Sequence, residues 1–270
     1  MNVLSETLQN IRIGEPRSFA GLTLFPLLAA EGTGSRDRPY VTLDEALAGR
    51  TVRITEVGEA GHVPELRLQN DGDRPVLLLD GEELVGAKQN RIVNTTILIL
   101  GNEIVVIPVS CVEQGRWGYA SERFTSEKRL APFRLRVLKA TSVHCSMRES
   151  GSFNSDQLEI WDDISARSAR RRAESPSQAM CEIYKKDRSS LKEYLEHFAM
   201  VESQVGAVFV IDGRVAGMEC FGKPETFRKT FEKLLESYAM DAIDSVKPEE
   251  GRKATSKAQV SEFIDSAAQS

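Results

Sequence analysis

The sequence has few of the side chains that build metal sites or disulfide frameworks. It contains three histidines, and no CxxC pair occurs among its four cysteines, which are Cys111, Cys145, Cys181 and Cys220. Single, widely spaced cysteines are typical of proteins from a reducing compartment. We therefore predict no metal site and no disulfide bond, and the expected location is the cytoplasm.

Long apolar runs and targeting signals are also lacking. The longest apolar stretches, at 97–100 and 104–109, are far shorter than the roughly 20 residues that cross a bilayer. The N-terminal segment contains an early acidic residue, Glu6, and no long apolar run, so we expect no secretory signal. A net charge of −5 does not favour an anionic partner. The sequence thus predicts neither a membrane nor a nucleic-acid partner.

The common catalytic and nucleotide-binding signatures are missing as well. The chain has no GxxxxGK[ST] loop, no HExxH helix, no GxSxG elbow and no GxGxxG turn between a strand and a helix. The sequence therefore indicates no particular cofactor. What is present is a chain of 270 residues, 41% hydrophobic and 28% charged, which is ordinary for a globular protein with a buried core.

The first half of the chain has the pattern of repeated short β-strands. Thr42 is expected to cap a short helix that ends at Gly49, with Glu45 in the capping-box position. Turn signals such as NDGD separate most of the strands, and repeated short strands of this kind favour an antiparallel sandwich or barrel. The predicted strands cover residues 19–28, 51–57, 63–70, 75–80, 91–100 and 103–112.

The second half is predicted to be mainly helical, with one β-hairpin. Residues 114–132 are expected to be irregular, and 134–143 favour a strand or a mixed structure. Ser175 is the expected N-cap of one helix, and Asp212–Gly213 is a strong turn signal within strands over 205–222. The predicted helices cover residues 156–173, 175–187, 189–202 and 227–243.

These elements predict an α+β fold. Its first half is antiparallel and β-rich, sandwich-like or barrel-like, and the helices and the β-hairpin of the second half pack on it. We predict a single domain over residues 1–245, with a β-rich core over about 19–120 and a helical and hairpin part over about 134–245. Residues 246–270 are expected to form a polar, mobile tail with a short helix near Val260–Ile264.

Two dense polar patches stand out at strand ends. The first, GEELVGAKQNR at 81–91, lies between two apolar strands, and the second is VSCVEQGRWGY at 109–119. Such groups are found together when they face each other or face a ligand. Each patch therefore has two interpretations: a binding site for a planar, charged ligand, or an ion-pair and packing arrangement. Cys111 is expected to be a buried, unreactive thiol.

Both patches closely resemble a known family. VLLLDGEELVGAKQNRIVNTTIL and IPVSCVEQGRW, together with TLDEAL and the IDGRVAGMECF hairpin, are similar to the mostly prokaryotic ARG-and-rhodanese-phosphatase-superfamily-associated protein domain family. ARG here means ADP-ribosylglycohydrolase. The resemblance covers nearly all of residues 15–245. It implies a role in ADP-ribose or related nucleotide metabolism, in association with ADP-ribosylglycohydrolase or rhodanese-type phosphatase proteins.

The resemblance implies a small-molecule ligand similar to ADP-ribose, and the residue types of the two patches suit such a ligand. Glu82 or Glu113 is the candidate general acid or base, so whether the chain is an enzyme stays open. The alternative is a non-catalytic ligand-binding or protein-interaction module, in which the motifs form a structural hydrogen-bond and ion-pair brace. The candidate ligand-binding residues are Lys88, Arg91 and Arg116 for phosphates, Gln89 and Asn90 for ribose hydroxyls or a base edge, and Trp117 for stacking.

Overall fold

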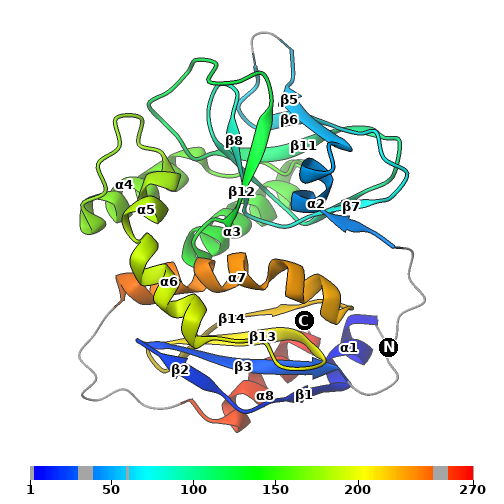
Figure 1. Cartoon of the computed structure of the whole chain (residues 1–270), viewed down its shortest axis with the longest axis vertical. Coiled ribbons are helices and arrows are strands. Elements are labelled where there is room, and N and C mark those ends of the chain that lie inside the picture. The colour runs from blue at the N-terminus through cyan, green and yellow to red at the C-terminus, as the bar shows by residue number, and fades with distance from the viewer. Residues whose placement is uncertain (1–2, 30–38, 59–60, 246–254, 270) are drawn as a thin grey trace. The chain divides into compact units, whose positions relative to one another are not determined.

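The computed structural model describes residues 3–29, 39–58, 61–245 and 255–269 (Figure 1). The chain forms two compact units, which we call unit 1, residues 1–37 and 189–270, and unit 2, residues 38–188. The predicted α+β class with antiparallel sheets is confirmed. The single domain over 1–245 stays a prediction. No helix within the described ranges is long and apolar enough to cross a membrane.

Unit 1 is a sheet with helices on both faces. β13, the central strand, is buried at all of its positions, and its Phe209 stacks on Tyr238 of α7 with ring centroids 3.8 Å apart. α8 covers the other face (Figure 1), where Val208 belongs to a buried cluster with Val260 and Ile264. The five strands are β1 (Ile11–Ile13), β2 (Arg17–Phe19), β3 (Leu22–Ala29), β13 (Gln204–Ile211) and β14 (Arg214–Cys220). The helices are α1 (Val3–Gln9), α6 (Arg188–His197), α7 (Pro224–Asp244) and α8 (Lys257–Gln269).

Two expectations about unit 1 agree with the structure. The predicted hairpin connects β13 and β14 through Asp212 and Gly213, whose φ angles of 47° and 76° suit a two-residue turn. The expected helix near Val260–Ile264 is present and longer than expected, since α8 begins at Lys257. Residues 246–254 of the predicted tail lie outside the described ranges.

Unit 2 consists of two sheets with a helix layer from its C-terminal part. One sheet contains β10 (Ile97–Ile99), β7 (Val76–Leu78) and β4 (Val41–Thr42), and only the β4–β7 pair is parallel. The helices are α2 (Leu43–Ala48), α3 (Phe133–Ser150), α4 (Gln157–Arg171) and α5 (Met180–Lys186). The six-stranded sheet has the order β12 (Phe124–Leu130), β8 (Glu82–Gly86), β9 (Arg91–Val93), β11 (Ile104–Cys111), β6 (Glu65–Asn70) and β5 (Val52–Glu56).

The six-stranded sheet curls into a half-barrel. Its two edge strands, β5 and β12, approach each other but are not hydrogen-bonded. α2 packs against both strands, and the predicted capping box at its start is confirmed, because Thr42 and Glu45 exchange hydrogen bonds. We call the gap between β5 and β12 the seam. It leaves two strand edges without a partner strand in the sheet, so polar backbone groups are available there.

Four sequence predictions in unit 2 need correction. Residues 134–143 lie in α3 and not in a strand, and residues 124–130 of the expected irregular segment form β12. Residues 91–100 form two strands, β9 and β10, and the Asn94 side chain between them hydrogen-bonds the Phe153 carbonyl and the Ser110 hydroxyl. Ser175 is not the N-cap of α5. Its hydroxyl accepts from the Ala179 N–H one turn before the helix begins.

Candidate functional site

The two predicted motifs lie side by side in unit 2. β9 and β11 pair antiparallel, and their register places Arg91 opposite Cys111. The polar residues that precede β9 and those that follow β11 therefore meet at the same end of the sheet. An isolated bridge between Glu113 and Ala179 adds the segment before α5 to this group.

Glu113 and Arg116 form the centre of the motif region. Arg116 donates from Nε to Glu113 Oε1 at 2.9 Å and from Nη2 to Oε2 at 2.6 Å. The carboxylate also accepts from Ser177 Oγ at 2.7 Å and from the Asn90 N–H at 3.0 Å. The remaining guanidinium N–H groups point at Asn90 Oδ1 and at the carbonyls of residues 86, 87 and 118. We call Glu113, Arg116, Asn90 and Ser177 the brace, because they join three segments of unit 2.

The brace keeps Glu113 ionised. Burial alone would raise the pKa of this carboxyl, but hydrogen bonds from Arg116, Ser177 and Asn90 outweigh burial, and the pKa is lowered. A carboxylate with a lowered pKa and four donors is a weak proton acceptor. All five N–H groups of Arg116 have acceptors within the chain, so binding a phosphate there would require breaking existing hydrogen bonds.

Arg91, Gln89 and Cys111 form a buried group beneath the brace. Arg91 is fully buried, and its Nη1 donates to Gln89 Oε1 at 3.1 Å. Within the described part of the chain, its Nε and Nη2 have no hydrogen-bond partner. Burial lowers the pKa of Arg91 and raises the pKa of Cys111. The thiol lies 3.3 Å from Gln89 Oε1 and is buried, as expected.

Trp117 and Tyr119 form the accessible part of the motif region, next to the buried side chain of Lys88. The Lys88 ammonium lies 5.2 Å from the Trp117 ring centroid and 5.1 Å from that of Tyr119. Both rings keep about half of their surface in solvent, with 52% and 57% exposed. The Lys88 N–H donates to Glu56 Oε1, which anchors this backbone to β5. The aromatic faces thus interact with a cation of the chain itself.

Glu82 and Glu83 point to opposite sides of β8, as expected for neighbours on a strand. Glu82 is buried and accepts from the Leu79 N–H at 2.8 Å, closing the turn before the strand. Glu83 is fully buried and pairs with Arg129 of β12 at 3.3 Å. Burial raises the pKa of Glu83 to about 7, and Arg129 only partly offsets this effect. Both glutamates therefore contact neighbouring parts of unit 2.

Two glycines of the first motif are required by close packing. Gly81 has a φ of 80°, and a Cβ there would lie 2.7 Å from Arg136 Cγ. Gly86 has a φ of 128°, and a Cβ there would lie 2.5 Å from Ser121 Oγ and 2.8 Å from the Arg123 carbonyl oxygen. Both positive φ values favour glycine. The spacing GEELVG therefore allows β8 to pack closely at both of its ends.

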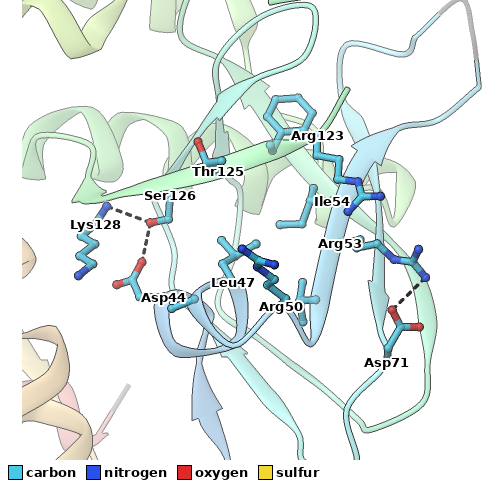
Figure 2. A pocket seen from close by; sticks show the side chains of 13 residues that line it. Asp44, Leu47, Arg50, Arg53, Ile54, Asp71, Arg123, Thr125, Ser126 and Lys128 are labelled. Atoms are coloured by element: carbon cyan, nitrogen blue, oxygen red, sulfur yellow. Dashed lines mark hydrogen bonds and ion pairs between the residues drawn. The ribbon is translucent and has the colours of Figure 1, made fainter. Parts of the chain in front are cut away.

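A cavity of about 660 Å³ lies at the seam, and we call it the seam cavity (Figure 2). None of the predicted site residues is among the described residues that line it. Its cationic side chains come from the end of α2, from β5 and from around β12, and its apolar wall comes from the half-barrel core. The cationic residues are Arg50, Arg53, Arg123 and Lys128, the apolar residues include Leu47, Val52, Ile54 and Phe124, and the acidic residues are Asp44 and Asp71.

The motif region supports the wall of the seam cavity. β12, which carries Phe124, Thr125 and Ser126 into the cavity lining, pairs with β8 of the first motif at both of its ends. Phe124 lies opposite Gly86, and the Glu83–Arg129 pair joins the same two strands. The position of β12 therefore depends on β8.

Sequence reasoning missed the cationic residues of the seam cavity. Arg53 is exposed between inward-facing Val52 and Ile54, a pattern shared by most surface arginines. Arg50 and Arg123 are also exposed and lie far apart in the sequence. The signal that could have found them is the curl of the sheet, which brings β5 and β12 together.

Replacing Arg116 by alanine should destabilise unit 2. The change leaves the buried Glu113 carboxylate without its ion partner. We expect a loss of about 2–3 kcal/mol in the free energy of unfolding, below the roughly 3–5 kcal/mol typical of fully buried pairs, because the Arg116 side chain is 23% exposed. Urea denaturation measures this loss. Arg74→Ala, at an exposed position of the same unit, is the control, and an equal effect of both variants would contradict the brace.

Replacing Glu83 by glutamine should remove a pH dependence of stability. The folded carboxyl has a pKa of about 7 against 4.5 when unperturbed, so the folded state binds an extra proton between these values. Stability of the native chain should thus fall by up to about 3 kcal/mol as pH rises from 4.5 to 7. Denaturation curves at pH 5 and pH 8 test this. Glu127→Gln, at an exposed position of β12, should keep the same fall in stability. If the Glu83→Gln variant also kept this fall, Glu83 would not be the group that causes it.

A comparison with protein families identifies the chain. A family model described as the ARG and Rhodanese-Phosphatase-superfamily-associated Protein domain matches residues 10–270. No curated protein and no solved structure matches the chain. The match covers both units and confirms the resemblance inferred from the two motifs. The chain belongs to the ARG and Rhodanese-Phosphatase-superfamily-associated Protein domain family.

Proposed function

We propose that unit 2 binds a phosphorylated small molecule of the nucleotide or ADP-ribose class in the seam cavity. The observation that carries this proposal is the combination of four cationic side chains and an apolar wall around about 660 Å³. Ligand pockets usually measure about 300–1,000 Å³ and combine apolar surface with a few placed polar groups. The seam cavity has both properties.

The charge balance of the cavity favours an anion. Asp71 pairs with Arg53 at 2.9 Å, and Asp44 accepts a hydrogen bond from Ser126 at 2.5 Å. Among the residues that the structure describes, the guanidinium groups of Arg50 and Arg123 have no ion-pair partner. Arginine recognises phosphate through two parallel N–H donors. A phosphate group would therefore compensate the excess positive charge of the cavity (Figure 2).

The family supports the same ligand class. Its description links the domain to ADP-ribosylglycohydrolase and rhodanese-phosphatase proteins, and ADP-ribosylglycohydrolases cleave ADP-ribose linkages. A protein that binds ADP-ribose or a related phosphorylated compound would suit a functional association with such enzymes. Leu47, which is only partly buried against the core, offers an apolar surface at the cavity for a base or for the face of a sugar.

In this proposal the motifs are the structural support of a binding module. Glu113 and Arg116 use their hydrogen-bonding groups on each other, and Glu82 closes a turn. We therefore favour ligand binding over catalysis by these carboxylates. A second candidate site is the exposed face of Trp117 beside Lys88, which could stack on a base.

Ligand binding is tested by thermal shift and calorimetry with ADP-ribose, ADP, AMP and ribose 5-phosphate, with adenosine as the uncharged comparison. A ligand at about 100 times its Kd should add about 2.7 kcal/mol, a Tm shift of a few degrees. Arg50→Ala and Arg123→Ala should each weaken binding about tenfold or more, because each removes a guanidinium from the cavity.

The matched control is Arg74→Ala, which removes the same charge from an exposed position of unit 2 outside the cavity lining. It should leave affinity nearly unchanged. The proposal is wrong if none of the phosphorylated compounds binds, or if the control weakens binding as much as Arg50→Ala. If Trp117→Ala abolishes binding and Arg50→Ala does not, the ligand binds at the second candidate site.

A further inference from the structure

A smaller hollow lies beside the seam cavity. It measures about 170 Å³ and is lined by Arg53, Thr55, Arg67, Gln69 and Arg123. Because a water molecule takes about 30 Å³ of liquid, this space holds roughly six waters, enough for a phosphate group. Arg53 and Arg123 also line the seam cavity, so the two spaces are neighbours and share two guanidinium groups.

The small hollow is built on one face of the β5–β6 pair. Thr55 lies opposite Arg67 and Arg53 lies opposite Gln69 in the antiparallel register. Alternation along each strand places these four side chains on the same, outward face. The two arginines are diagonal neighbours, close enough for both to reach one anion between them.

The arginines of the hollow are partly ordered and in excess over acidic groups. Asp71 accepts from Gln69 Nε2 at 2.8 Å and pairs with Arg53 at 2.9 Å, so this carboxylate positions Arg53 at the rim. Within the described ranges, Arg67 and Arg123 have no ion-pair partner. Three guanidinium groups therefore face one small space with a single neighbouring carboxylate. Like charges this close repel each other, and a bound anion would relieve that repulsion.

We propose that the ligand of unit 2 carries two linked phosphates, one in the seam cavity and the other in the small hollow. This inference rests on the proposed function and adds that the ligand contains a diphosphate group. Arg53 and Arg123, which line both spaces, lie between the two phosphates and can donate to each. Thr55 and Gln69 add neutral donors at the outer phosphate. The ligand class is a nucleoside diphosphate or a diphosphate-linked nucleotide sugar.

The experiment compares ADP with AMP by calorimetry on the full chain. The native protein should bind ADP at least tenfold more tightly than AMP. Arg67→Gln, which changes a residue of the small hollow alone, should bring ADP affinity down to that of AMP and change AMP affinity by less than threefold. Arg50→Gln, which changes a residue of the seam cavity alone, should lower the affinity for both ADP and AMP.

The controls separate this inference from the proposed function. Arg74→Gln should leave the affinity for both ligands unchanged. The melting temperature of each variant, measured without ligand, reports whether that variant is folded. If ADP and AMP bind equally and Arg67→Gln affects neither, the diphosphate site is refuted while the proposed function stands. If Arg67→Gln lowers the affinity for AMP as much as the affinity for ADP, the small hollow is not a separate phosphate site. If neither nucleotide binds, the proposed function and this inference both fail.

Discussion

The ion pair between Glu113 and Arg116 is the interaction on which the rest of unit 2 depends. The carboxylate is almost fully buried, so it is stable only with its charge and hydrogen-bonding capacity satisfied. The arrangement that satisfies it uses Asn90 after β8, Arg116 after β11 and Ser177 before α5. Moving any one of these segments would take at least one hydrogen bond away from the buried carboxylate. The pair thus determines how three distant parts of the sequence meet.

β8, the strand that Asn90 of the brace follows, also pairs with β12, one edge strand of the seam. An open sheet has two edges that can slip or pair with other chains, and proteins commonly protect such edges. Here β12 is joined to β8 by its ladder and by the Glu83–Arg129 pair. Ser126 of β12 also donates to Asp44 of α2. Helix α2 therefore covers the gap without closing the barrel, and the space between the edge strands remains as a cavity with polar walls.

Local signals predicted the elements that depend on local chemistry. The capping box of Thr42 and Glu45 and the hairpin turn at Asp212–Gly213 both require only neighbouring residues, and both are present. Helix α3 was not predicted because tertiary contacts decide its buried face. Lys139 on that face is fully buried because Asp80 pairs with it and the Asn94 carbonyl accepts from it. A buried lysine interrupts the apolar period on which helix prediction relies.

In the candidate site, too, the sequence predicted what depends on neighbouring residues and missed what depends on distant ones. The two motifs were recognisable because many polar residues stand close together in the sequence, and buried polar networks need that density to satisfy one another. The arginines that line the seam cavity do not require such a dense run of polar residues. Arg53 lies on one edge strand and Arg123 directly precedes the other, and only the curl of the sheet brings them to one cavity. Under the proposed function, the motif that identifies the family marks the support of the site, and the residues that contact the ligand are ordinary surface arginines in the sequence.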